Sequence, residues 1–314
     1  MSAVHRITRP ARGPTVGEAV AAYLATLDHP ESAGTRRVYA ATLRALRTAF
    51  DAQTPLVVLA EPAQVQTLTV WFEQSWGHKA AATYNRNLDA LRSALHYWSD
   101  QDWIHGDPTR SLRRRGRAPD RSKGLARELV DQLLTRDDLA LRERVLWRML
   151  YETAARAREI LALDIDDLDR RNRSAKVRRK GGAVDTVIWQ TGTARLLPRL
   201  IGTRTSGPLF LTDRAARVQL PPADLDPSSG RARLSYRRAA ELFEHATTGI
   251  PSGPWTLHQL RHSALTHAAE DGANTATLLA YSGHTSVTSL ARYTRLSPEA
   301  LSRWQQTRDT ARRR

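Results

Sequence analysis

The sequence predicts a mainly helical protein with a small β-hairpin, built as an N-terminal four-helix domain and a C-terminal mixed α/β domain. Apolar residues recur at helical spacing through most of the first hundred residues. In the second half, two short strand-like runs flank Lys180-Gly181-Gly182, which is typical of a hairpin. A length of 314 residues also suits two domains, each with its own core.

Four amphipathic helices are expected in a domain spanning residues 15–106. The first follows Thr15, which has the capping-box spacing to Glu18. The other three are expected over 35–50, 63–76 and 80–98. Asp107-Pro108 ends the domain, because proline cannot continue a helix and disfavours helix in the residue before it.

Basic segments flank this helical domain. Residues 1–14 form a short basic arm, and a basic linker is expected over 107–124. Runs of charge are often only solvated, but flexible basic segments also follow DNA phosphates, and the sequence leaves both alternatives open. The candidate DNA-binding residues are Arg86, Arg113, Arg114, Arg115 and Arg117.

A second domain is expected from residue 125 to 314. Its helices are expected over 127–134, 139–153, 193–200, 234–246, 256–270 and 275–282, with a last helix after Ser297. The hairpin strands are expected at 175–178 and 184–188. Residues 213–231 are rich in Pro, Ser, Asp and Gly, so an irregular loop is expected there.

The composition favours a polyanionic partner. The formal net charge is +16 and the isoelectric point is about 11.0, which favours nucleic acid over a membrane surface. The absence of cysteine excludes disulfides, thiol catalysis and cysteine-bound zinc. No apolar run is long enough for a membrane helix, and the N-terminus does not resemble a signal peptide. A cytoplasmic, nucleoid-associated protein is therefore expected.

The segment 257–262 places three groups that bind phosphate on one helix face. Arg261 and His262 follow His258 by three and four residues, which brings all three to the same side of a helix. Two imidazoles and a guanidinium offer several donors to an anion. A zinc-protease motif is excluded, because Gln259 stands where that motif needs glutamate.

Other candidates lie before and after this segment. Arg156 and Glu159 are one helical turn apart, so the carboxylate either orients the guanidinium or forms an ordinary surface ion pair. The remaining candidates are Lys180 at the hairpin tip, the pair Gly283-His284, and Tyr293.

In their order along the chain, these residues resemble the tyrosine recombinase (phage integrase) family. That order is Arg156 with Glu159, Lys180, His258-x-x-Arg261, Gly283-His284 and Tyr293. The resemblance covers the whole second half, and the first half is similar to the helical core-binding domain of the family. Ala154-Ala155 departs from the usual glycine and apolar residue. The chain looks like the two-domain members that lack a separate arm-binding domain.

The resemblance implies a catalytic role for each of these residues. Tyr293 would be the nucleophile and would form a 3′-phosphotyrosine link, with Tyr281 as the alternative. Arg156 and Arg261 would clamp the phosphate. Lys180 would protonate the leaving oxygen. The remaining roles are further donation by His258 and His284 and support by Glu159 and His262. No cofactor and no metal are implied.

The implied partner is double-stranded DNA. Four protomers are expected to bind two DNA sites, and the protein is expected to be a monomer off DNA. The segment after Tyr293, with Leu301 and Trp304, is expected to pack either on a neighbouring protomer or on its own domain. Two alternatives remain open at this point: a type IB topoisomerase-like enzyme and a noncatalytic DNA-binding regulator.

Overall fold

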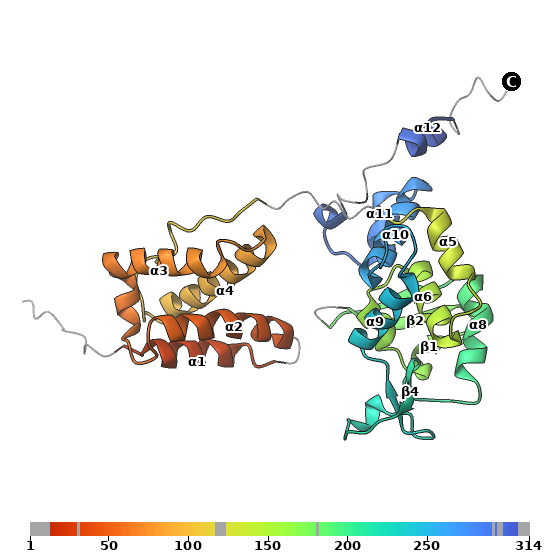
Figure 1. Cartoon of the computed structure of the whole chain (residues 1–314), viewed down its shortest axis with the longest axis horizontal. Helices are drawn as coiled ribbons and strands as arrows, with labels where there is room; N and C mark the ends of the chain where they lie inside the picture. The colour runs from red at the N-terminus through yellow and green to blue at the C-terminus, as the bar shows by residue number, and fades with distance from the viewer. Residues whose placement is uncertain are drawn as a thin grey trace, which may run out of the picture. The chain divides into compact units, whose positions relative to one another are not determined.

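The chain forms two compact units, Met1–Asp120 and Arg121–Arg314, in a computed structural model (Figure 1). The structure describes residues 13–29, 32–116, 124–179, 182–290, 293 and 298–306. Within these ranges, no helix is both long enough and apolar enough to cross a membrane. The prediction of a mainly helical fold with small antiparallel sheets is confirmed.

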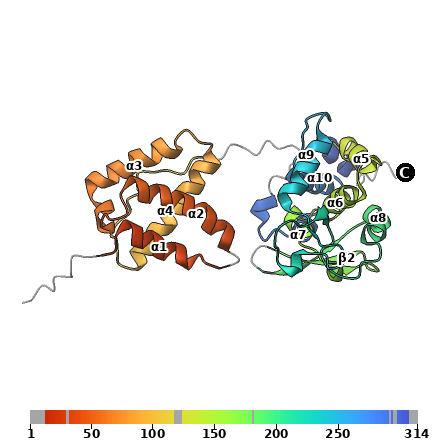
Figure 2. The same cartoon turned by 60° about the horizontal axis from the view of Figure 1, so that its bottom comes forward.

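The described part of the first unit contains the four predicted helices. They are α1 (Val16–Thr26), α2 (Ala33–Ala49), α3 (Pro62–Trp76) and α4 (Ala81–Asp100), with a 3-10 turn at Leu56–Ala60. The predicted capping box is present, because Glu18 N–H donates to the Thr15 hydroxyl and Thr15 N–H donates to the Glu18 carboxylate. Helix α4 packs against the other three (Figures 1 and 2), and its buried Trp98 indole donates to the Ala19 carbonyl at 2.9 Å.

The segment 107–116 packs on the first unit, which differs from the basic linker expected there. Leu112 is buried in the core of the unit. The Asn85 side chain accepts from Arg115 N–H and donates to Arg115 C=O, both at 2.8 Å. The Arg92 guanidinium donates to the Leu112 carbonyl at 2.7 Å. The expected linker is thus docked along α4 as far as residue 116, because its backbone polar groups find side-chain partners there.

The second unit combines helices with two small antiparallel sheets. In its described part the helices are α5 (Arg127–Thr135), α6 (Leu141–Thr153), α7 (Ala157–Leu161), α8 (Thr191–Ile201), α9 (Tyr236–Thr247), α10 (Leu257–Glu270), α11 (Thr275–Ser282) and α12 (Pro298–Gln306). The first sheet has the order β1 (Leu168–Asp169), β2 (Ser174–Arg178), β3 (Val184–Ile188), and the second pairs β4 (Leu211–Ala215) with β5 (Arg231–Arg233).

The strand pair β4 and β5 corrects one prediction. An irregular loop was expected over 213–231, but the two ends of this stretch pair as strands. The last three side chains of β4 are exposed, but the pairing is held because Arg231 donates to the Thr212 carbonyl and Ala232 N–H donates to the Thr212 hydroxyl. The hairpin β2–β3 was predicted correctly, and the short strand β1 adds a third strand beside it.

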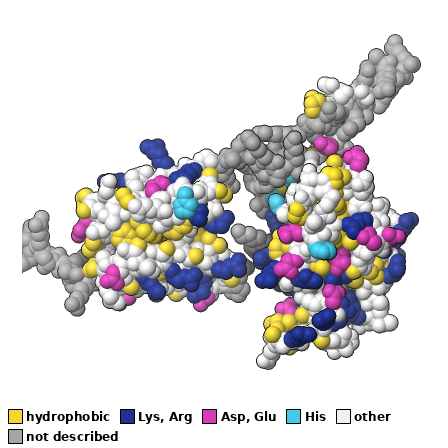
Figure 3. Space-filling model, in the orientation of Figure 1, with side chains coloured by type: hydrophobic (Ala, Val, Ile, Leu, Met, Phe, Trp, Pro, Cys, Tyr) yellow, Lys and Arg dark blue, Asp and Glu magenta, His cyan; other side chains and the backbone are white. Residues whose placement is uncertain are grey.

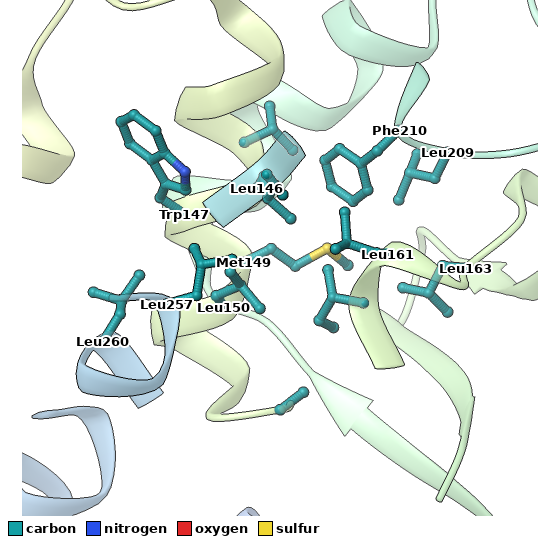
Figure 4. Close-up of a cluster of buried hydrophobic side chains, with 14 of the residues drawn as sticks. Leu146, Trp147, Met149, Leu150, Leu161, Leu163, Leu209, Phe210, Leu257 and Leu260 are labelled. Atoms are coloured by element: carbon teal, nitrogen blue, oxygen red, sulfur yellow. The ribbon is translucent and has the colours of Figure 1, made fainter. Parts of the chain in front are cut away.

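Helix α6 runs through the core of the second unit. Figure 4 shows its side chains Leu146, Trp147, Met149 and Leu150 among buried groups from α7, α10 and the segment before β4. Trp147 also meets Phe243 of α9 edge-to-face, with ring centroids 5.2 Å apart. The C-terminal end of α6 is therefore held in a fixed position relative to α10.

Replacing Leu112 tests whether the 107–116 segment belongs to the folded unit. We expect Leu112→Ala to lower the free energy of unfolding of the first unit by about 2 to 5 kcal/mol, because a buried side chain leaves a cavity. Urea unfolding of the full chain, followed by pulsed hydrogen exchange of peptides from α1 to α4, measures this. Arg113→Ala is the control, since Arg113 is an exposed neighbour. Equal stability of the two variants would mean that the segment is only a solvated linker.

Candidate active site

Helix α10 carries the predicted His258, Arg261 and His262. The helix begins with a capping box between Thr256 and Gln259, which fixes its first turn. Arg261 and His262 are buried, whereas His258 is exposed in the first turn. The same helix thus carries two buried members of the set and one exposed member.

The Arg261 guanidinium is held by the C-terminal ends of two other helices. Its Nη1 donates to the carbonyl of Ala154, directly after α6, and its Nη2 donates to the carbonyl of Ser282, the last residue of α11, at 2.7 Å. Such terminal carbonyls lack partners within their own helix and carry the negative end of the helix dipole. Ala154 has a left-handed φ of 47°, a conformation that glycine adopts with less strain than alanine.

The surroundings of Arg261 lower its pKa to about 10. Burial is the largest cause, and repulsion by the Arg156 guanidinium is the next. Glu159 and Tyr293 act in the opposite direction, and Arg179 adds to the repulsion. These four groups therefore lie within electrostatic reach of Arg261.

Arg156 and Glu159 form the predicted pair. Arg156 stands at the N-cap of α7, where Glu159 accepts from its main-chain N–H at 2.9 Å and from its Nη1 at 2.8 Å. The Glu159 side chain is only 5% exposed, so this is not an ordinary surface ion pair. The Arg156 side chain is 40% exposed, which leaves donors available to a ligand.

Sequence reasoning missed Arg179. Its side chain is 7% exposed, and it donates to Glu159 at 2.6 Å and pairs with Asp185 at 2.9 Å. The signal was the alternation of strand β2, in which Ala175 and Val177 point inward and residue 179 follows with the same period. The next residue, the predicted proton donor Lys180, lies outside the described residues.

The pair Gly283-His284 follows α11. Gly283 ends that helix with φ of 60°, a conformation that glycine adopts without strain. A Cβ atom at this position would overlap the Arg179 guanidinium. Glycine is thus needed here for two independent reasons.

Tyr293 lies beside two of the predicted histidines. Its ring centroid is 4.9 Å from that of His262 and 6.2 Å from that of His284, with the latter pair nearly parallel. The side chain is 2% exposed, and Tyr293 N–H donates to the Leu290 carbonyl at 2.7 Å. The predicted nucleophile therefore packs against imidazoles.

Tyr281, the alternative nucleophile, is committed elsewhere. Its hydroxyl donates to the carbonyls of Tyr151 at 3.1 Å and Glu152 at 3.0 Å. Burial raises its pKa, which disfavours the phenolate. These contacts support the choice of Tyr293.

A pocket of about 560 Å³ opens beside these groups. Arg156, Arg179, His284 and the Asp185 carboxylate line it, together with apolar and small residues of the hairpin, α11 and the turn after α11. In the described part of the chain, no cluster of three or more His, Asp or Glu side chains has the geometry to hold a metal ion. The positive lining can accommodate an anion such as a phosphodiester.

The candidate DNA-binding arginines differ in how much of each side chain is available. Arg86 and Arg113 are exposed. Arg114 pairs with Asp89, and Arg115 pairs with Glu73 at 2.9 Å and lies over a tyrosine ring. Arg117 lies outside the described residues. In Figure 3, Lys and Arg side chains are spread over the visible faces of both units, with acidic groups among them.

Comparison with known proteins assigns the family. The model of the phage integrase family matches residues 124–300. The chain belongs to that family. It is 31% identical over 286 residues to tyrosine recombinase XerC of Mycobacterium sp. (strain JLS), covering 88% of this chain and 92% of that protein. It is also 34% identical over 166 residues to XerD of Mycobacterium leprae (strain TN), covering 52% and 51% of the two chains.

Solved structures of the same fold include several recombinases. The transposon Tn1549 integrase in complex with circular intermediate DNA aligns with a TM-score of 0.67 and 16% identity, covering 94% of this chain and 99% of that one. The post-cleavage complex of XerH recombinase with its difH substrate has a TM-score of 0.67 and 14% identity, with 94% and 97% covered. The expectation that this chain is a tyrosine recombinase, an enzyme that cleaves and rejoins DNA, is confirmed.

Replacing Gly283 tests the close contact with Arg179. We expect Gly283→Ala to slow covalent attachment to DNA by about 10²-fold, because displaced active-site groups are costly. Gly272→Ala is a matched control, since Gly272 also has a positive φ but open space around its Cβ position. Gly272→Ala should lose only the about 1–2 kcal/mol that left-handed alanine costs, and Gly283→Ala should lose more because its Cβ also displaces Arg179. Rates are read from SDS-resistant adducts, and equal rates for the two variants would contradict the prediction.

Proposed function

We propose that this recombinase cleaves DNA by transesterification, with Tyr293 as nucleophile and a 3′-phosphotyrosine as intermediate. The observation that carries the proposal is the proximity of Tyr293 to two imidazoles and to the positive charge of Arg261. The phenolic oxygen would form a bond to phosphorus while the bond from phosphorus to the 5′ oxygen breaks. Religation is the same step in reverse, so the energy of the diester is conserved.

The positive groups of the site would stabilise the transition state. In a five-coordinate phosphorus the nonbridging oxygens gain negative charge, and preorganised donors lower the energy of that state. Arg156 and Arg261 would clamp these oxygens, with His258 and His284 as further donors. Glu159 and His262 would support the arginine and the tyrosine that they contact.

Two proton transfers complete the reaction. His258 would accept the proton of the Tyr293 phenol, and Lys180 would give a proton to the 5′ leaving oxygen. A phenol, with an ordinary pKa near ~10, leaves more readily than an alkoxide, so the phosphotyrosine stays reactive enough for religation. The chemistry proposed here needs no metal and no cofactor.

We further propose double-stranded DNA as the partner, with four protomers on two sites and a monomer off DNA. The net charge of +16 supports DNA binding, as do the DNA complexes of the Tn1549 integrase and XerH. Leu301 and Trp304 of α12 are 46% and 44% exposed, which suits a helix that packs on a neighbouring protomer. A DNA partner of this kind would locate the protein in the cytoplasm, on the nucleoid.

The assignment of Tyr293 is tested with a library of nicked duplexes of randomised sequence, from which the full chain captures its own site covalently. Tyr293→Phe should bind the recovered duplex and form no SDS-resistant adduct, because only the attacking oxygen is lost. Tyr281→Phe is the matched control and should still form the adduct. In the wild-type adduct, the released strand should carry a free 5′-hydroxyl that a polynucleotide kinase can label. An adduct with Tyr293→Phe would reject the nucleophile.

The role of Lys180 is tested by changing the leaving atom. Lys180→Ala should cleave the recovered duplex slowly, by about 10²-fold or more, because the 5′ alkoxide leaves without a proton. A duplex with sulfur in place of the scissile 5′ oxygen should be cleaved at nearly the wild-type rate, since a thiolate leaves unaided. Single-turnover rates on the two duplexes measure this, and a defect of equal size on both would remove Lys180 from the acid role.

A further inference from the structure

Four charged side chains, three of which line the pocket, form a chain of alternating sign. Arg156 donates to Glu159, Glu159 also accepts from Arg179, and Arg179 pairs in turn with Asp185. Arg179 and Glu159 are 7% and 5% exposed, so the link between them is shielded from water. In such surroundings the pairing of one charge strongly affects its neighbours.

The single charge of Glu159 is shared by two guanidinium groups. Its Oε1 accepts from Arg156 Nη1 at 2.8 Å, and its Oε2 accepts from Arg179 Nη1 at 2.6 Å. Without Arg179, the whole carboxylate charge would act on Arg156. A carboxylate and a guanidinium then favour a bidentate pair, which turns two guanidinium donors toward the carboxylate.

Arg179 is itself held from three sides. Asp185 of β3 accepts from its Nε at 3.0 Å, and Gly283 leaves the space that the guanidinium fills. Its main chain closes the hairpin, because Arg179 N–H donates to Ala183 C=O at 2.8 Å. The side chain therefore joins the hairpin, α7 and the turn after α11 at the pocket.

We propose that Arg179 is a positioning residue for Arg156. By occupying one oxygen of the Glu159 carboxylate, it leaves the positive charge and the remaining donors of the Arg156 guanidinium available to the phosphate. This inference rests on the proposed role of Arg156 as a clamp on the scissile phosphate. Arg179 would thus affect the reaction through Arg156 and not by contact with a reacting atom.

A substrate with less charge separates this role from a merely structural one. In a methylphosphonate, a methyl group replaces one nonbridging oxygen and the diester is neutral, so the arginine clamp has less charge to stabilise. The probe is the nicked duplex recovered with the wild-type protein, made once with the ordinary phosphodiester and once with a methylphosphonate at the scissile position. Single-turnover adduct formation at saturating full-length protein is the measurement.

Arg179→Met should cleave the phosphodiester about 10²-fold more slowly than wild type, as expected for a displaced catalytic group. On the methylphosphonate this deficit should shrink to within about tenfold, and Arg156→Met should show the same pattern because its donors act on the same charge. Arg179→Lys should recover part of the rate. Arg178→Met removes an exposed guanidinium from the same strand and is the control, with an unchanged rate expected.

A second variant tests the shared carboxylate directly. Glu159→Gln added to Arg179→Met should raise the phosphodiester rate above that of Arg179→Met alone, because the amide no longer neutralises Arg156. Failure of this recovery, or an Arg179→Met deficit of equal size on both duplexes, would overturn the proposal. A deficit rescued only by sulfur at the 5′ oxygen would instead mean that Arg179 acts through Lys180, which also overturns it.

Other outcomes would reject the proposed function itself and can be told apart from failure of the inference about Arg179. If the wild-type protein forms no adduct, or if Arg156→Met cleaves the phosphodiester at the wild-type rate, the assignment of the site is wrong. If both behave as expected while Arg179→Met equals wild type, only the inference about Arg179 is lost. A melting temperature for each variant off DNA shows whether the protein is folded at the assay temperature.

Discussion

Several positive charges must be held together in a partly buried place, and much of the second unit is arranged to permit this. Burial and the nearby Arg156 guanidinium lower the pKa of Arg261 to about 10, which measures how unfavourable its charge is there. A buried charge is tolerated only when its donors find acceptors. Carbonyl groups serve Arg261, and the Glu159 carboxylate serves the two other arginines.

The acceptors for Arg261 come from helix ends, and the packing of those helices fixes where they point. Helix α6 runs through the apolar core (Figure 4) and ends just before Ala154, whose left-handed backbone presents its carbonyl to the Arg261 guanidinium. Helix α11 ends at Ser282 and Gly283 in the same way. Apolar packing of α6 and α11 therefore determines the position of the Arg261 guanidinium. The dipoles of both helices favour a cation at these ends.

Local patterns predicted the helices, the β2–β3 hairpin and the ordered set of polar residues that carries the family resemblance. The alternation of β2 reaches position 179, but a charged residue at the end of a hairpin strand is normally solvated, and its buried partner Glu159 lies twenty positions earlier. The docking of 107–116 was missed for the same reason, since its backbone is satisfied by Asn85 and Arg92 of α4, which lie 20 to 30 positions earlier in the sequence. Contacts between residues far apart in sequence leave no periodicity to detect.

The mutual repulsion of the Arg156 and Arg261 guanidinium groups is itself part of how such a site would act. Arg156 and Arg261 repel each other when no anion lies between them, and Glu159 offsets this only partly because its carboxylate is shared. A phosphodiester anion would relieve the repulsion on binding. In a five-coordinate phosphorus the nonbridging oxygens carry more negative charge than in the bound diester, so the relief would be larger in the transition state. Only an interaction that strengthens between these two states accelerates the reaction. Complete neutralisation of the arginines by protein carboxylates would remove that difference, which is why a single shared carboxylate suits this chemistry better than one acid for each arginine.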